Sequence, residues 1–177
     1  VCLPNKLSED LASFIGYLQG DGHKSSEFSI RITDCDKNLL SAYKEIVRNV
    51  FEFEPIIRHH SDKKKNAFWL EINNVQILRF IEKNFPETLL PSNHRSAPKK
   101  VIENNIEIKK AYLRGLFDAE GSVVSNPRAI KLMTSSSELL RNIRRLLTEI
   151  GIPTTICNDE IRISSIYGIN AFANKIG

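Results

Sequence analysis

Residues Ala111-Tyr-Leu-Arg-Gly-Leu-Phe-Asp-Ala-Glu-Gly-Ser-Val123 repeat an earlier stretch, Ala12-Ser-Phe-Ile-Gly-Tyr-Leu-Gln-Gly-Asp-Gly-His23. Both stretches carry a small residue at every fourth position, a spacing that lines one narrow face of a helix. Glycine inside a helix costs about 0.5–1 kcal/mol relative to alanine, so we expect the small residues of this face to permit a contact that offsets the cost. We therefore predict two helices packed small face to small face, through Ala12, Gly16 and Gly20 and through Ala111, Gly115 and Ala119.

An acid follows the last small residue of each copy, and a glycine follows the acid: Asp21-Gly22 and Glu120-Gly121. If the helices end together, the two carboxylates meet, and they repel unless cations lie between them. Hard oxygen ligands suit Mg²⁺, and close carboxylates around divalent metals form a site for phosphodiester hydrolysis. A solvated acid before a helix-capping glycine would explain either copy alone. The matched pair favours a metal site instead.

Phe14-Ile-Gly-Tyr-Leu-Gln-Gly-Asp-Gly22 and Leu113-Arg-Gly-Leu-Phe-Asp-Ala-Glu-Gly121 resemble the two signatures of LAGLIDADG homing endonucleases. The first departs from the namesake motif at Gln19, where the motif has an acid. The resemblance implies an α+β fold of two pseudo-symmetric αββαββα halves. Each half would be a curved antiparallel sheet backed by helices, and together they would form a DNA-binding saddle. We expect the first half at residues 1–86, a linker at 87–107 and the second half at 108–177.

The segments after the motifs repeat as well, with helical and alternating apolar patterns in the same order. Ser8 and Asp36 are expected to cap helices. In the first half we expect a polar turn over residues 23–27 and then a strand over residues 28–33, with Phe28, Ile30 and Ile32 facing the core. In the second half we expect a hairpin around Asn158-Asp159.

The free faces of the two sheets mix cations with hydrogen-bonding side chains, which suits contacts with phosphates and base edges. An exposed polar strand face without any partner is the alternative. Trp69 can instead belong to the rim of the core, and the lysines at 63–65 can be a solvated hairpin tip. The candidate DNA contacts are Ser29, Arg31, Thr33, Arg58, His60, Lys63, Lys64, Trp69, Glu71, Asn73, Arg128, Lys131, Met133, Arg162 and Ser164.

The resemblance further implies the chemistry of a homing endonuclease of an intron or intein. Asp21 and Glu120 would be the catalytic residues and would bind Mg²⁺, with Mn²⁺ able to substitute, helped by the backbone carbonyls of Gly20 and Ala119. The expected reaction is metal-dependent hydrolysis of both DNA strands across the minor groove, leaving short 3′ overhangs. Two motifs in one chain imply a monomer on a long, asymmetric site in double-stranded DNA.

The family often places lysine or glutamine at the strand-to-helix junction after each motif, and this chain does not. The junctions read Thr33-Asp34-Cys35 and Thr134-Ser135-Ser136, so Arg31 and Lys131 are the nearest basic candidates. Two other functions stay open on the same fold. One is a catalytically inactive DNA-binding protein; the other is an RNA maturase that uses a second basic surface at Arg141, Arg144 and Arg145.

Composition sets broad bounds on the remaining possibilities. The 177 residues include 25 Lys and Arg against 21 Asp and Glu, a net charge of +4 that is only mildly suggestive of a polyanionic partner. Three scattered cysteines (Cys2, Cys35 and Cys157) lack zinc-ligand spacing and are typical of reduced thiols. No apolar run reaches membrane-spanning length. These observations predict an intracellular protein that makes no contact with a membrane.

Overall fold

The computed structural model describes residues 1–59 and 67–177 and has two halves built from the same order of elements. The first half comprises α1 (Glu9–Asp21), β1 (Gly22–Ser26), β2 (Ser29–Asp34), α2 (Lys37–Phe51), β3 (Ile56–His59), β4 (Phe68–Asn73) and α3 (Val75–Asn84). The second half comprises α5 (Ile106–Glu120), β5 (Gly121–Ser125), β6 (Arg128–Met133), α6 (Ser137–Ile150), β7 (Thr155–Cys157), β8 (Glu160–Ile163) and α7 (Ile166–Lys175). The predicted α+β architecture is confirmed.

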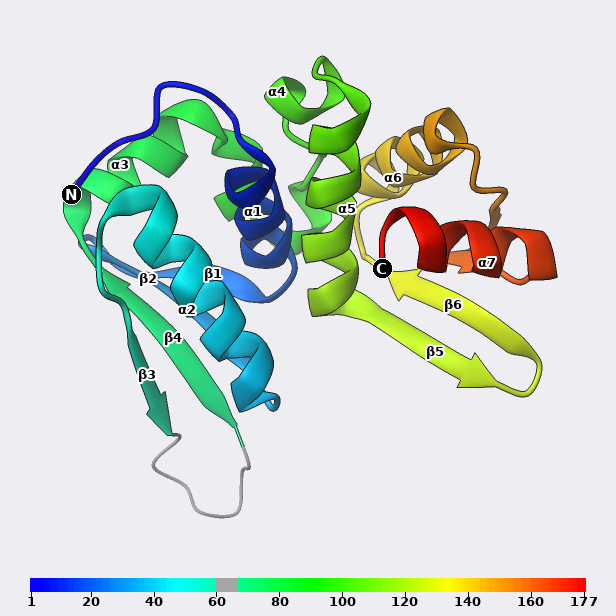
Figure 1. Cartoon of the computed structure of the whole chain (residues 1–177), viewed down its shortest axis with the longest axis horizontal. Helices are drawn as coiled ribbons and strands as arrows, with labels where there is room; N and C mark the ends of the chain where they lie inside the picture. The colour runs from blue at the N-terminus through cyan, green and yellow to red at the C-terminus, as the bar shows by residue number, and fades with distance from the viewer. Residues whose placement is uncertain (60–66) are drawn as a thin grey trace.

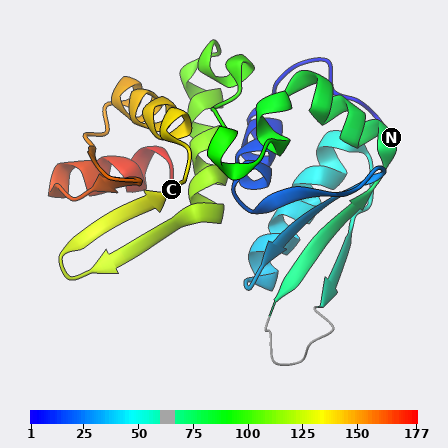
Figure 2. The ribbon, with the colours of Figure 1, turned by 180° about the vertical axis from the view of Figure 1, so that it is seen from behind.

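Each half contains a four-stranded antiparallel sheet, with the strand order β1-β2-β4-β3 in the first and β5-β6-β8-β7 in the second. Helices α1 and α5 lie side by side at the centre of the molecule, and the rest of each half lies to its own side of this pair (Figures 1 and 2). The two helices run in the same direction and each leads directly into the first strand of its sheet. Their C-terminal ends therefore lie between the two sheets.

The helix starts follow from side chains that accept hydrogen bonds from free backbone N–H groups. Ser8 accepts from the N–H of Leu11 at the start of α1, as expected from the sequence. Asp36 does the same for Asn38 and Leu39 at the start of α2. The inner side of each helix then packs on its sheet. In α2 this side consists of Leu40, Tyr43, Val47 and Phe51, all of which are buried.

The connection between the halves, residues 85–105, is largely folded into single turns. It contains η1 (Pro86–Leu89), η2 (Ser92–His94) and α4 (Lys99–Ile102). Ala97 and Val101 are buried within the common hydrophobic core of the two halves. The connection therefore packs against the helices instead of looping away from them.

The start of the first sheet differs from the sequence prediction. Residues expected to form a polar turn make the edge strand β1, because Gly22, His23 and Lys24 pair with Ile32, Arg31 and Ile30 of β2. An edge strand bonds to one neighbour only and needs no alternating apolar pattern, so composition did not reveal it. Strand β2 starts at Ser29, which leaves Phe28 in the turn with 67% of its surface exposed instead of facing the core.

Among the described residues, no helix is long and apolar enough to cross a membrane.

Candidate metal and nucleic-acid site

The two motif helices approach each other through glycines that leave no room for a side chain. A Cβ on Gly16 would lie 2.1 Å from the carbonyl oxygen of Tyr112, and a Cβ on Gly115 would lie 1.9 Å from that of Ser13. Further along, a Cβ on Gly20 would lie 2.3 Å from the Cβ of Ala119. Real Cβ atoms essentially never come closer than 3.0 Å to such neighbours. The small faces at these positions therefore permit backbone-to-backbone contact of α1 with α5.

This contact brings the two acids of the repeat to one place. Asp21 is the last residue of α1 and is half-buried, whereas Glu120, the last residue of α5, is more exposed. Burial raises the pKa of Asp21 from its ordinary value of 3.8 to about 7; the charges of Glu120 and Asp34 add to the shift, and Arg95 opposes it. Burial likewise raises the pKa of Glu120, again opposed by Arg95. A nearby positive charge therefore favours the ionised form of both carboxylates.

The donor set fits a hard divalent cation that keeps some of its water. Two carboxylates and the backbone carbonyls beside them are oxygen ligands of the kind that Mg²⁺ prefers, and Mg²⁺ commonly binds through one or two carboxylates plus substrate phosphates. Within residues 1–59 and 67–177, no group of three or more His, Cys, Asp or Glu side chains is placed to hold a metal. The chemistry of the pair therefore suits Mg²⁺ or Mn²⁺, with the remaining positions left to water and phosphate oxygens.

Arg95 reaches this site from the connection between the halves, and sequence reasoning missed it. Its Nη1 donates to the carbonyl oxygens of Gln19 and Gly20, the latter at 3.0 Å, and its Nη2 donates to that of Gly22 at 3.2 Å. These are carbonyls at the C-terminal end of α1, which otherwise lack partners within the helix. No pattern in the sequence pointed to Arg95, since the linker has no counterpart elsewhere in the repeat.

The residue at which the first motif departs from its namesake has a structural role. Gln19 is fully buried and accepts a hydrogen bond from Tyr112 Oη at 2.6 Å, while its Nε2 donates to the carbonyl oxygen of Ser96 at 2.8 Å. A neutral amide can both accept and donate at this point, whereas a carboxylate could only accept when ionised. Gln19 therefore links α1 to α5 and to the connection.

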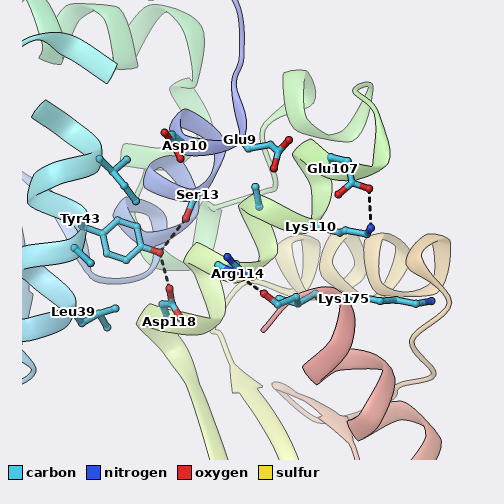
Figure 3. A pocket seen from close by; sticks show the side chains of 14 residues that line it. Glu9, Asp10, Ser13, Leu39, Tyr43, Glu107, Lys110, Arg114, Asp118 and Lys175 are labelled. Atoms are coloured by element: carbon cyan, nitrogen blue, oxygen red, sulfur yellow. Dashed lines mark hydrogen bonds and ion pairs between the residues drawn. The ribbon is translucent and has the colours of Figure 1, made fainter. Parts of the chain in front are cut away.

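The matching position of the second motif, Asp118, makes a different link. Its Oδ2 accepts from Tyr43 Oη at 2.8 Å, and Tyr43 Oη lies 3.2 Å from Ser13 Oγ (Figure 3). These residues line a cavity of about 320 Å³ on the flank of the helix pair, into which Arg114 also projects. Burial raises the pKa of Asp118, and the hydrogen bond from Tyr43 opposes this shift. The network joins α2 to both motif helices.

The outer face of the first sheet carries a connected row of charged side chains. Glu71 of β4 accepts from Arg31 of β2 at 2.9 Å and from Arg58 of β3 at 2.8 Å. The Arg31 guanidinium also lies 4.7 Å from the centre of the Trp69 ring. Thr33 and Asn73 are exposed. These residues alternate with Ile30, Ile32, Leu70 and Ile72, which are buried.

The expected outward position of Ser29 needs correction. It shares a side of β2 with Arg31 but is only 7% exposed, because Ser25 Oγ at 2.6 Å and Ser26 Oγ at 2.8 Å close over it. The irregular pairing of β1 with β2 between Lys24 and Ser26 brings these hydroxyls into position. Three further candidates, His60, Lys63 and Lys64, lie outside the described residues.

The second sheet repeats the charged row with different residues. Lys131 of β6 lies opposite Arg162 of β8, and Lys131 Nζ lies 2.8 Å from Glu160 Oε2. Met133 is 61% exposed at the end of β6, and Arg128 is exposed at its start. Ser164 is exposed just beyond the end of β8. The outer faces of the two sheets thus differ in side chains although their frames match.

No lysine stands beside the acids at the strand-to-helix junctions, and the two basic candidates nearest to them are engaged. Arg31 pairs with Glu71, and Lys131 pairs with Glu160. His23 lies two residues beyond Asp21 on β1, opposite Arg31. Its pKa is lowered by burial and by the charges of Arg31 and Arg95. Sequence reasoning did not place His23 beside the acids, because its strand was not predicted.

Comparisons with known proteins agree with this geometry. A family model described as a LAGLIDADG-like domain matches residues 8–84 and 107–177. Among solved structures, the homing endonuclease I-DmoI in complex with DNA and Mn is similar, with a TM-score of 0.70, 16% identity and 97% of each chain covered. The N-terminal LAGLIDADG domain of DUF199/WhiA has a TM-score of 0.65 at 15% identity, covering 98% of this chain and 83% of that one. At these identities the likeness to the solved structures is one of fold.

Curated relatives match through a segment of their length. The homing endonuclease I-ApeI of Aeropyrum pernix is 25% identical over 125 residues, which are 64% of this chain and 56% of that protein. A glutamine–fructose-6-phosphate aminotransferase of Methanocaldococcus jannaschii is 31% identical over 152 residues, which are 86% of this chain but 14% of that protein. A replication factor C small subunit of the same organism is matched over 8% of its length. Because these latter two names describe unrelated activities, they do not transfer to the shared segment.

Proposed function

The chain belongs to the LAGLIDADG family, and from this premise we propose that it is a site-specific double-strand DNA endonuclease of the homing type, associated with an intron or an intein. We propose that cleavage requires Mg²⁺, for which Mn²⁺ substitutes, and that it occurs across the minor groove and leaves short 3′ overhangs. The substrate is DNA inside the cell, and the chain acts on it as a monomer.

One observation carries this proposal: two acids end two helices that touch through their backbones, between two sheets with charged outer faces. Asp21 is half-buried and both acids have raised pKa values, so the fold brings them together at an electrostatic cost. A purely structural helix pair would not need both acids. A divalent cation between them offsets that cost and gives the pair a chemical use.

Asp21 and Glu120 would hold the metal, with the carbonyls of Gly20 and Ala119 beside them. When bound, Mg²⁺ polarises a phosphate ester and lowers the pKa of an attacking water. The chain's own part is to fix both carboxylates on rigid helix ends, since misplacement by about 1 Å can cost about a hundredfold in rate. The ends of α1 and α5 lie between the two sheets (Figure 1), and this central position supports contact with both strands of one duplex.

The outer faces of the sheets would bind the DNA on either side of the acids. Arg31, Arg58, Lys131 and Arg162 would contact phosphates and base edges, once DNA replaces their acidic partners Glu71 and Glu160. We propose that the two halves, residues 1–86 and 108–177, each recognise a different half of the DNA site. Residues 87–107 are the linker that joins them. The proposal follows from the different side chains at matching positions, such as Glu71 on the first sheet and Arg162 on the second.

A cleavage assay on a DNA library with Mg²⁺ tests this function, with Asp21→Asn and Glu120→Gln in parallel. We expect one long site to be cut on both strands by the wild type, and both substitutions to abolish cutting while binding persists. Specific binding without cutting in Mg²⁺ or Mn²⁺ would leave a DNA-binding protein. Binding to intron RNA that survives Arg58→Ala would leave a maturase.

A further inference from the structure

The guanidinium of Arg95 is seated among four backbone carbonyls. Besides the carbonyls of Gln19, Gly20 and Gly22, its Nε donates to the carbonyl oxygen of Leu90 at 3.0 Å. The side chain thus has a defined position at the end of α1. One of its acceptors, the carbonyl of Gly20, belongs to the proposed metal site.

The backbone of Arg95 is fixed equally well. Its carbonyl oxygen accepts from Ser136 Oγ at 2.5 Å, and the same hydroxyl caps α6 by accepting from the N–H of Leu139 at 3.1 Å. On the following residues, the carbonyl oxygen of Ser96 accepts from Gln19 and the N–H of Ala97 donates to Asn142 Oδ1 at 2.9 Å. Arg95 is therefore anchored to the second half and reaches with its side chain into the first.

Arg95 also faces the acids. With Gly20 and Glu120 it lines a cavity of about 360 Å³, whose lining also includes Ser92, Thr134, Ser135 and Asp159. Its charge lowers the pKa of both Asp21 and Glu120, against the upward shift that burial causes. A divalent cation that bound Glu120 and the carbonyl of Gly20 would compete with this guanidinium for the carbonyl and lie close to its charge. The two positive charges would repel at close range.

The Arg95 guanidinium breaks the twofold symmetry of the site. The repeat pairs Gly20 with Ala119 and Asp21 with Glu120, but the connection that contains Arg95 occurs once in the chain. The Asp21 side and the Glu120 side of the acid pair therefore differ in their surroundings.

We propose that Arg95 is a positioning residue that occupies the Gly20 carbonyl and makes the Glu120 side of the acid pair the weaker divalent-cation site. This inference rests on the proposed function. Metal enters that side only when the guanidinium gives up the carbonyl, so the two DNA strands are cut in order instead of together. The first strand is the one served by the Asp21 side.

Mn²⁺ binding to the DNA-free protein tests the proposal without cleavage. Titration followed by electron paramagnetic resonance should show one stronger and one weaker site in the wild type. In Arg95→Gln the weaker site should gain at least tenfold in affinity, and adding Glu120→Gln should abolish that gain. Arg114→Gln is the matched control, because Arg114 also bonds a backbone carbonyl, that of Ile176, and lowers the pKa of a neighbouring acid, Asp118. It should leave the isotherm unchanged.

A folded Arg95→Gln variant with the wild-type isotherm would overturn the proposal and leave Arg95 as a helix cap only. If the variant does not fold, the wild type still decides the question. The ¹⁵Nε–H resonance of Arg95 should shift on saturation with Ca²⁺, and a resonance that stays in place contradicts the proposal. If Asp21→Asn and Glu120→Gln both leave Mn²⁺ binding unaltered, the proposed metal site itself has failed, which is a distinct outcome.

Discussion

Replacing Gly16 by alanine tests whether backbone contact between α1 and α5 sets the geometry of the acids. The added Cβ would lie 2.1 Å from the carbonyl oxygen of Tyr112 and 2.8 Å from the N–H nitrogen of Leu116. Both neighbours are backbone atoms of α5, so no side-chain rotation can relieve the clash. To restore an ordinary contact the helices must separate by roughly 1 Å, as for other over-packed cores.

Two opposing terms set the size of the effect. Alanine in an open helix interior is favoured over glycine by about 0.5–1 kcal/mol. Over-packing a tight contact costs about 1–3 kcal/mol and occasionally more. Because the obstacle here is backbone, we take the upper end of the cost and expect a net loss of about 2 kcal/mol in the free energy of unfolding. The same separation displaces Asp21 from Glu120 and should lower the cleavage rate by about a hundredfold.

Denaturant unfolding of Gly16→Ala, Gly115→Ala and the double variant measures the stability term. The two sites share one contact, so the double variant should lose less than the sum of the single losses. Gly168→Ala is the control: its added Cβ meets the side-chain atoms Ser165 Oγ at 2.8 Å and Ile163 Cγ2 at 2.9 Å, away from the helix pair. It should lower stability less and leave cleavage unchanged. If Gly16→Ala is as stable as the wild type or more stable, the close-packing argument is wrong.

Three further predictions concern charged groups. Without metal, Asp21→Asn should stabilise the protein at pH 8, because the folded-state pKa of about 7 lies above the ordinary 3.8 and ionised Asp21 therefore destabilises the fold. The full pKa shift converts to about 4 kcal/mol in the free energy of unfolding, and solvent screening reduces this to about 1–2 kcal/mol. Chemical unfolding in EDTA measures the gain, which should vanish by pH 4. Tyr43→Phe removes the 2.8 Å hydrogen bond to Asp118 and should lower the free energy of unfolding by about 1–3 kcal/mol, more at pH 8 than at pH 5. A variant as stable as the wild type would contradict the network. Arg58→Ala should lower the slope of log K against log salt for DNA binding by about 1, whereas Arg79→Ala on α3 should not; equal slopes would remove Arg58 from the interface.

The fold could be predicted because repetition and periodicity are local properties of the sequence. Small residues at every fourth position defined the facing sides of two helices, and the strand alternation around Ile30 and Leu70 gave the buried sides of the first sheet. Both follow from the geometry of a single element. The position of each acid at the end of its helix could be anticipated for the same reason, since a glycine follows each acid.

The remaining features depend on contacts between elements, which periodicity does not encode. Strand β1 forms because Gly22, His23 and Lys24 find partners on β2, and its own composition does not require it. Ser29 is buried because two serines of the neighbouring strand fold over it. Arg95 belongs to a connection of single turns whose path is set by Ser136 and Asn142, residues more than forty positions away along the chain.

The departures from twofold symmetry are concentrated where the chain cannot be symmetric. A fused pair of halves needs one connection, and this connection packs against the end of α1 through Gln19 and Arg95. An amide suits the first motif because it must bond both Tyr112 and the linker, whereas Asp118 in the second motif accepts from Tyr43. The linker thus has an electrostatic effect as well as a covalent one. A symmetric dimer of one half would have no single Arg95 beside its acids, so under our proposal its two metal sites would be equal and the two DNA strands would be cut at the same rate.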